Sequence, residues 1–433
     1  MKLRTVLLSA LSFVLLAATP IFSLDWGGVI DNSTELLVSD KTEFDQQDKL
    51  SLWMDAALGE RWSFSAQGSY TYELDRPYLF DVDSLQFEGR FPNVEKGPTL
   101  FTVTLGRFSF SDFTGLVLDH RADGFALGFN YPNSIFTVAL GYTGLLLKPT
   151  STIRVSLTDA SEDNDDSVVL APPRAVGALK AVFPELLGRQ DLTLSLLFQQ
   201  DLHSKDDLVA EGQTTPDYNK GGQLNTQYLG FGFSGPLSSS LYYDAFVYGG
   251  MGRTLSYIDG AYKYETILAA LGGVGVRYYL EQALSSRVGF RFLYASGDED
   301  SDRPYEGNTG GLATAFLPIS KPELGLIFQP QLSNLFLAEL SYSLKPLAWM
   351  QVQLKAVPFF RSTPAPIQES GIDPSSDALY LGTEVDGAIN IRPFSDLGLG
   401  FSAGLFLPNS GTNGALPDRA LEVKGKLDFS FSF

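Results

Sequence analysis

The sequence predicts an all-β fold: a transmembrane antiparallel up-and-down β-barrel of about 18 strands, with 16 strands as the alternative. Apolar and polar residues alternate with a period of two over most of the chain, which gives each strand one apolar and one polar face. The alternating segments exceed the ~5–6 residues usual in soluble proteins and reach the ~9–11 residues that a tilted strand needs to cross a bilayer. Aromatic residues such as Trp53, Trp62 and Tyr72 collect near strand ends, as girdles at membrane interfaces require.

The composition excludes several classes of protein. The chain has no cysteine, so disulfides and Cys-ligated zinc or iron–sulfur sites are impossible. Its net charge is -19 and it has no basic run, which makes it a poor nucleic-acid binder because phosphate contacts need clustered Lys and Arg. The 44% of apolar residues and 13% of aromatic residues are too many for a wholly disordered chain.

The first residues have the parts of a secretory signal peptide. Lys2 and Arg4 precede an uncharged apolar stretch from Val6 to Ala18, and small residues follow it. This stretch is shorter than the ~20 residues that span a bilayer as a helix. We therefore expect residues 1–23 to be a signal peptide that is cleaved after Ser23. Residues 24–433 are then a single barrel domain with long extracellular loops.

Strands follow one another through the rest of the chain. Between Trp62 and Leu74 the even positions are apolar, aromatic or small, and the odd positions are polar. The segments 136–143 and 379–391 alternate in the same way. We expect strands near 26–37, 48–58, 61–74, 81–91, 99–109, 121–131, 135–146, 172–184, 190–202, 224–235, 239–253, 263–280, 284–297, 332–345, 348–361, 378–392, 396–408 and 419–433. Sixteen strands stay possible because 26–37 and 172–184 alternate poorly.

The connections are expected to alternate between short turns at one end and long polar loops at the other. Gly59-Glu60 and the segment 132–134 are examples of the short turns. The long polar connections include 147–171, 203–223, 298–331 and 362–377. An even number of strands then leaves both chain ends on the side of the short turns.

The last strand carries the most specific signal. Its apolar residues occupy one face up to the terminal position, namely Leu421, Val423, Leu427, Phe429, Phe431 and Phe433. This strand resembles the C-terminal strand of bacterial outer-membrane β-barrel proteins, which ends in Phe behind alternate apolar residues. The resemblance implies a location in the bacterial outer membrane, in contact with outer-membrane lipid. It also implies that the barrel-insertion machinery reads Leu427, Phe429, Phe431 and Phe433 as a membrane-insertion signal.

A barrel of 16–18 strands is too wide for wall side chains to fill, so it leaves an aqueous channel unless loops plug it. A charged side chain that faces lipid costs ~2–4 kcal/mol at the bilayer midplane, so the charged positions of the strands should face this channel. The expected pore-lining residues are Asp55, Glu73, Arg287, Arg291, Glu339, Gln351, Gln353, Lys355, Glu384, Asp386, Lys424 and Lys426. Arg107 conflicts with this rule, because it shares its face with apolar residues. It lies above the membrane, or its strand has a bulge.

Two segments are candidates for narrowing the channel. The stretch from Gly106 to Gly124 is similar to a stretch after an early strand in several porin families, where a long loop folds into the barrel. The similarity implies that Asp112, Asp119, Arg121 and Asp123 lie at or near a constriction; the alternative is an ordinary surface loop. The segment 298–331 is long and partly apolar, so we expect it to pack inside the mouth or against another loop.

These features favour a porin-like channel for the passive diffusion of small hydrophilic solutes. Carboxylates concentrate in the segments 159–166 and 298–306, which predicts a preference for cations because acidic rings attract cations and repel anions. One alternative is a non-conducting surface barrel that anchors partner-binding loops. Another is a gated transporter of hydrophobic compounds that uses 298–331 as part of an apolar path.

We expect no catalytic residues, no resident metal and no cofactor. His120 and His203 are the two histidines, and neither stands in a motif of a nucleophilic or metal-dependent enzyme. Asp298, Asp300 and Asp302 have the spacing that begins a calcium loop. Arg303, however, stands where the turn of such a loop needs Gly.

Overall fold

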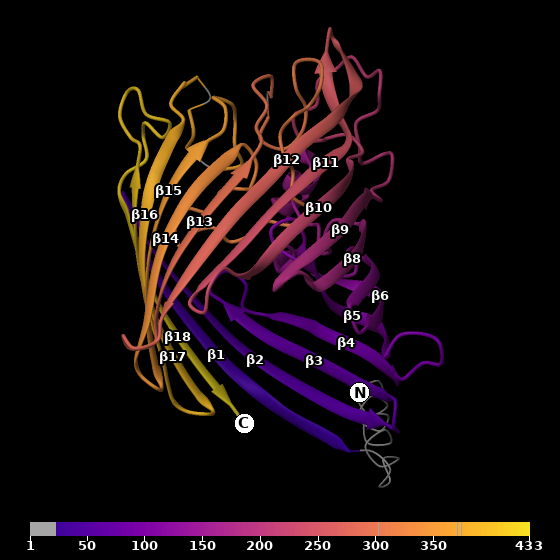
Figure 1. Cartoon of the computed structure of the whole chain (residues 1–433). Coiled ribbons are helices and arrows are strands. Elements are labelled where there is room, and N and C mark those ends of the chain that lie inside the picture. Colours follow the sequence, from indigo (N-terminus) through magenta and orange to yellow (C-terminus); the bar gives the residue numbers. More distant parts are fainter. Residues whose placement is uncertain (1–22, 302, 370, 374) are drawn as a thin grey trace, which may run out of the picture.

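The computed structural model describes residues 23–301, 303–369, 371–373 and 375–433, which form one closed antiparallel sheet of 18 strands (Figure 1). Each strand pairs with its neighbours along the chain, and β18 closes the ring on β1 from Val29↔Ser432 to Val38↔Val423. Closure gives each strand a paired neighbour on both sides, as a bilayer requires. The predicted up-and-down barrel is confirmed, with 18 strands rather than 16. Residues 1–22 of the expected signal peptide lie outside the described residues.

The strands lie close to the expected segments. Their bounds are β1 (Leu24–Val38), β2 (Thr42–Leu58), β3 (Trp62–Glu73), β4 (Leu79–Pro92), β5 (Leu100–Ser111), β6 (Asp119–Tyr131), β7 (Ser134–Tyr142), β8 (Arg174–Leu187), β9 (Gln190–Asp201), β10 (Asn225–Pro236), β11 (Leu241–Ile258), β12 (Ala261–Leu280), β13 (Ser286–Ala295), β14 (Leu335–Leu347), β15 (Met350–Arg361), β16 (Tyr380–Phe394), β17 (Leu397–Pro408) and β18 (Glu422–Ser432). A 3-10 turn, η1 (Lys148–Thr150), and a short helix, α2 (Leu157–Asp163), lie between β7 and β8. Among the described residues, no helix has the length and apolar character needed to cross a membrane.

Alternate strand positions carry the apolar outer surface. In β2, Leu52 and Met54 are exposed large apolar residues, and Asp55 lies on the opposite, inward face. The stripe expected on β18 is likewise exposed from Leu421 to Phe433. Trp53 does not belong to an outer girdle as expected, because it shares the inward face with Asp55 and its ring lies against Gly27. Position parity, rather than nearness to a strand end, decides which face an aromatic residue takes.

The two ends of the barrel differ, but less regularly than expected. The described N-terminus and the C-terminus lie at one end, here called the turn end; the opposite end is the loop end (Figure 1). Some connections at the loop end are short, because β1 and β2 are joined by residues 39–41 and β11 and β12 by Asp259 and Gly260. Asp259 and Gly260 both have positive φ, 54° and 82°, as a two-residue hairpin turn requires. The β11–β12 hairpin therefore continues as paired strands where a loop was expected.

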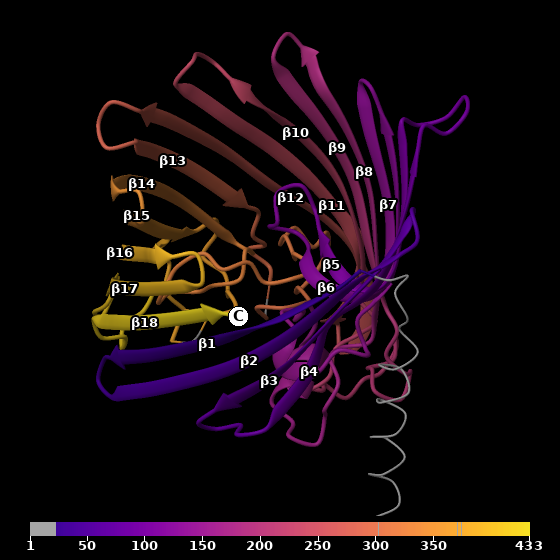
Figure 2. The ribbon, with the colours of Figure 1, turned by 90° about the horizontal axis from the view of Figure 1, so that it is seen from below.

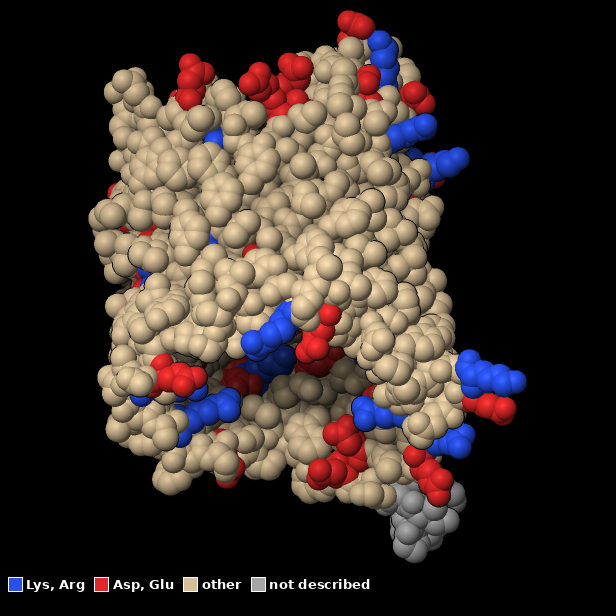
Figure 3. Space-filling view, viewed as in Figure 1, with Lys and Arg blue, Asp and Glu red and all other residues tan. Residues whose placement is uncertain are grey.

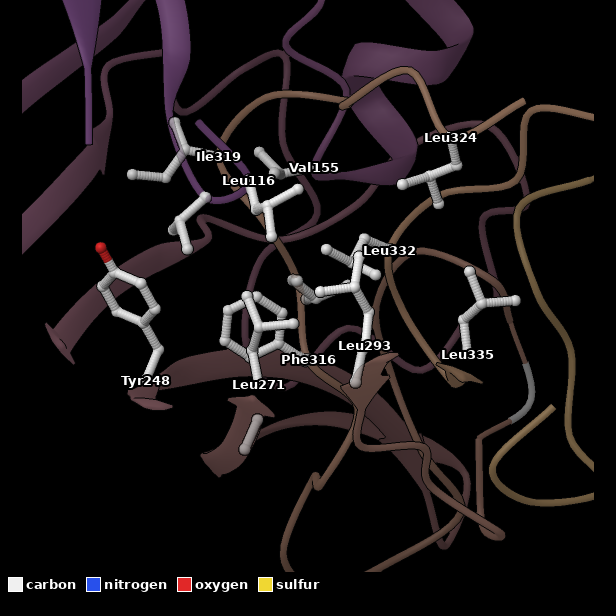
Figure 4. Close-up of a cluster of buried hydrophobic side chains, with 14 of the residues drawn as sticks. Leu116, Val155, Tyr248, Leu271, Leu293, Phe316, Ile319, Leu324, Leu332 and Leu335 are labelled. Atoms are coloured by element: carbon white, nitrogen blue, oxygen red, sulfur yellow. The ribbon is translucent and has the colours of Figure 1, made fainter. Parts of the chain in front are cut away.

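The main hydrophobic core lies inside the barrel. Segments of the loop end, among them 112–118, 143–173 and 296–334, fold into the lumen and pack their apolar side chains on the inner wall (Figure 2). Leu116, Val155, Phe316 and Ile319 from these segments belong with Tyr248 of β11 to one cluster of buried apolar side chains (Figure 4). The expected aqueous lumen is therefore partly filled near the loop end. Loop residues do this, since the wall side chains alone could not reach across so wide a barrel.

Candidate functional site: the lumen and its inserted loops

The end of the β5–β6 hairpin leaves the barrel wall. β4 pairs with β5 only as far as Leu85↔Arg107, and β6 pairs with β7 only as far as Asp123↔Tyr142. Beyond these pairs the hairpin turns into the lumen (Figure 2). Gly106 sits at the bend with φ 114°, and a Cβ there would lie 2.0 Å from the Leu85 carbonyl oxygen. Only glycine fits this position, so the bend is encoded locally.

The bend explains why Arg107 has the parity of a lipid-facing residue. After the turn, the outer face of the hairpin meets the inner wall of β4. Arg107 pairs with Asp81 at 3.6 Å and with Asp123 at 2.8 Å, and Arg121 pairs with Asp81 at 3.2 Å and with Asp83 at 2.8 Å. These ion pairs fix the hairpin against one side of the barrel and keep both arginines out of lipid.

The tip of the hairpin reaches the far wall. The buried Asp112 carboxylate accepts hydrogen bonds from the backbone N–H groups of Val117 and Leu118 at 3.0 and 2.9 Å. It also accepts one from the Tyr248 hydroxyl of β11 at 2.8 Å. The Phe113 ring stacks on Tyr248, with 5.3 Å between ring centroids. Segment 112–118 therefore spans the lumen and divides it.

The four residues expected at a constriction take different places. Asp112 is buried and holds the tip, so it presents no free charge to the lumen. Arg121 and Asp123 are in the ion pairs at the bend. Asp119 is exposed, and its backbone N–H donates to the Ser320 hydroxyl at 2.7 Å. The structure thus brings the hairpin and segment 296–334 together inside the barrel.

Segment 296–334 contains the expected plug, 298–331, and is fastened to the wall through Glu384 of β16. The Glu384 carboxylate accepts hydrogen bonds from the backbone N–H groups of Leu326, Ile327 and Phe328, the last at 2.7 Å. Glu384 is 0% exposed. It therefore does not line an open channel, contrary to expectation, because the loop covers it.

A buried cluster of charged side chains connects α2, in the segment between β7 and β8, to the barrel wall. Ser156 and Asp159 form a capping box at the start of α2, and Arg174 of β8 donates to both carboxylate oxygens of Asp159 at 2.7 Å. Sequence analysis missed this cluster. The Ser-x-x-Asp spacing of the cap was its one local signal.

His203 links the same loop to segment 202–224. Its Nδ1 lies 2.6 Å from a carboxylate oxygen of Asp201, and its Nε2 lies 3.1 Å from a carboxylate oxygen of Glu162. Burial alone would lower the pKa of His203, but the hydrogen bonds to Asp201 and Glu162 raise it to about 9. The imidazolium therefore acts as a structural cation between two loops.

Several of the expected pore-lining residues form ion pairs between neighbouring strands. Arg291 pairs with Glu339 at 2.7 Å, and Lys355 pairs with Asp386 at 3.1 Å. Both Lys424 and Lys426 pair with Glu35 of β1, at 2.6 and 3.1 Å. Glu35 was missed because its strand alternates poorly. Within the described chain, the inward positions without an ion pair include Asp55, Glu73, Arg287, Gln351 and Gln353.

The described residues leave open spaces inside the barrel, among them the following two. A hollow of about 550 Å³ lies at the loop end of β1, β2, β3 and β18, bordered by Glu35, Glu43, Asp45 and Lys424. A second cavity of about 350 Å³ lies against β9–β13 and is bordered in part by Phe113. Figure 3 shows a further opening toward the turn end with Lys, Arg, Asp and Glu side chains around it. The lumen is thus narrowed and has a polar boundary on one side.

No protein-family model matches the chain, and no curated protein matches its sequence. Solved structures of Pseudomonas aeruginosa outer-membrane porins do match it. OccK3 (OpdO) has a TM-score of 0.56 at 13% identity, over 94% of this chain and 96% of that one. OccK2 (OpdF) has a TM-score of 0.56 at 11% identity, over 95% and 98%. OprD has a TM-score of 0.53 at 10% identity, over 94% and 96%. The chain therefore has the fold of outer-membrane porins.

Proposed function

We propose that the protein is a porin-like channel of the bacterial outer membrane, through which small hydrophilic solutes diffuse passively. The observation that carries this proposal is the hollow of about 550 Å³ at the loop end, which has a charged border in a barrel whose outer surface is apolar. Water and polar solutes can occupy such a space, whereas a barrel that serves only as an anchor needs none. The long loops are then extracellular, and the partners are outer-membrane lipid and the barrel-insertion machinery.

The proposal includes a preference for cations and no chemical turnover. Acidic residues border the hollow at Glu35, Glu43 and Asp45, and Lys424 is the one basic side chain beside them. Fixed carboxylates at a narrow mouth raise the local concentration of cations. One similar structure, OccK2 (OpdF), is in complex with glucuronate, a small polar solute that is an anion and so bears on the passage of polar solutes and not on the preference for cations. It supports a diffusive channel by analogy and leaves the solute of this chain open.

Conductance in planar bilayers tests the proposal. Purified protein should give steady unitary current steps in KCl, and the reversal potential in a KCl gradient should have the sign for potassium over chloride. A heat-denatured sample of the same preparation serves as the control for detergent leaks. Protein that inserts in folded form but carries no current would contradict the channel and favour the anchor for partner-binding loops.

A further inference from the structure

We infer that solutes cross the barrel off-centre, along the wall formed by β18, β1, β2 and β3, and that the unpaired carboxylates of this wall select small cations over anions. This inference rests on the proposed function and adds the route and the residues that select the solute. Three independent observations carry it: where the apolar filling lies, where the lumen is open, and how the charges of the wall are paired.

The apolar filling covers only part of the wall. Its buried strand residues run from Phe110 of β5 through Tyr248 of β11 to Phe406 of β17. Within the described chain, β1–β4 and β18 contribute no residue to this cluster. The apolar contacts of the inserted loops therefore lie on one side of the barrel, and the β5–β6 hairpin meets β4 through the ion pairs of Arg107 and Arg121. The space they leave follows the first strands and the last.

The uncovered wall is open at both ends. The hollow of about 550 Å³ lies at its loop end. Asp45 and Gln47 are exposed there on the inward face of β2. Toward the turn end, Asp55 of β2 and Ser63 of β3 are also exposed on inward positions. Polar inward positions of this wall are thus exposed toward both ends of the barrel, with the buried Ser51 of β2 and Ser69 of β3 between them.

The charges of this wall are unbalanced. Its basic groups are all engaged: Lys424 and Lys426 pair with Glu35, and Lys49 pairs with Asp83 at 3.3 Å. Inward carboxylates on β1 and β2 have no ion pair within the described chain, namely Asp25, Asp31, Glu43, Asp45 and Asp55. Uncompensated carboxylates along a narrow path attract cations and repel anions.

The opposite wall has a different balance. Arg277 pairs with Asp244 at 2.8 Å and Arg291 pairs with Glu339, so carboxylates there are matched by arginines. Arg287, on an inward position of β13, adds a positive charge that has no ion pair among the described residues. A cation that follows the wall of β18 and β1–β3 therefore meets a more negative surface than it would on the opposite side.

Single cysteines can locate the route, because the chain has none of its own. Gln47→Cys places a thiol on the proposed route, and Thr193→Cys places one on the far wall beside the cavity of about 350 Å³. Each variant is treated with a trimethylammonium-ethyl thiosulfonate, and labelling is checked by mass. The label should reduce the unitary conductance of Gln47→Cys about twofold, because it adds bulk and positive charge to the route. Labelled Thr193→Cys should keep the conductance of the unlabelled protein.

Charge substitutions test the choice of solute. Glu43→Gln combined with Asp45→Asn should lower the potassium-to-chloride permeability ratio about twofold. Asp206→Asn combined with Asp207→Asn removes the same charge from an exposed loop and should leave the ratio unchanged. Conductance that falls for labelled Thr193→Cys and not for labelled Gln47→Cys would overturn the route while the channel stands. Absence of current from the unmodified protein would overturn both.

Discussion

The protonation of His203 and Glu306 makes the stability of the loops depend on pH. Burial raises the pKa of Glu306 to about 8, and the nearby Asp159 carboxylate adds to the rise. The pKa of His203 is about 9. Both values lie above those of the unfolded chain, ~4.5 and ~6.5. The stabilisation of the folded state by His203 is therefore complete below pH ~6.5 and is lost as the pH rises through 9. The stabilisation of the folded state by Glu306 is complete below pH ~4.5 and is lost as the pH rises through 8. Alkaline pH should loosen the loops.

Glu162→Gln should lower the pKa of His203 from about 9 toward its ordinary value, because the imidazolium loses one of its two carboxylate acceptors. Histidine ring resonances followed by NMR across pH measure the change. The chain has two histidines, so a His120→Ala variant assigns the signals and leaves the His203 contacts in place. An unchanged pKa would show that Asp201 alone holds the charge.

Single residues also show which features of the structure the sequence can predict and which it cannot. Parity placed Lys355 and Lys424 on the inward face correctly, since a strand side chain has only two directions. The same rule could not show that Glu384 lies under a loop, because its partners are 56 to 58 residues away in the chain. Arg174 was missed for the same reason, since its acceptors come from α2 and β9.

Among the elements, the β5–β6 hairpin is one whose departure from the wall is indicated by the sequence. Arg107 broke the alternation of its strand, and Gly106 preceded it. This charged residue at an apolar position lies where the strand leaves the barrel wall. A break in the alternation of apolar and polar residues can therefore locate such a bend. The acceptors on β4 were not predictable, because they depend on how far the hairpin turns into the lumen.

Segment 296–334 should become mobile when its fastening on β16 is removed. Glu384→Ala deletes three backbone hydrogen bonds to a carboxylate, each of which typically contributes ~1.5–3 kcal/mol, so the loop should detach and the unitary conductance should rise. Single-channel recordings in KCl measure the change. Glu323→Ala is the matched control, because this exposed carboxylate lies in the same segment and holds no backbone group. Equal conductance in both variants would show that the fastening does not limit the current.

For the whole molecule, the barrel followed from the sequence because its two determinants are spread over the chain. Alternation fixes an inside and an outside, and the long strands with a terminal Phe indicate a bilayer. The choice between 16 and 18 strands stayed open for a physical reason visible in β1. Its outward positions include Asn32 and Thr34, and Asn32 donates to Asp48 of β2 at 2.7 Å. Polar residues that form hydrogen bonds with one another on the outer face make the alternation of apolar and polar residues less regular.

Phe433 should be needed for a stable closed barrel. Its backbone N–H donates to the Gly28 carbonyl, and its own carbonyl accepts from the Gly28 N–H, both at 3.0 Å, while its ring lies against Gly28. Phe433→Ser should lower the fraction of protein that folds and inserts, measured as the fast-migrating band in unheated gels. Phe394→Ser removes another exposed aromatic ring, at the last residue of β16, and should fold as the unchanged protein does. Matching losses in the two variants would argue against a special role for the last residue.

The seam between β1 and β18 has a consequence for biogenesis. β1, the first strand in the sequence, pairs with β18, the last strand. The barrel therefore cannot close before β18 is present. Until then the leading strand carries an unsatisfied hydrogen-bonding edge, which is open to wrong pairing. A chain of this topology without β18 has no partner for the open edge of β1 and cannot reach the closed state.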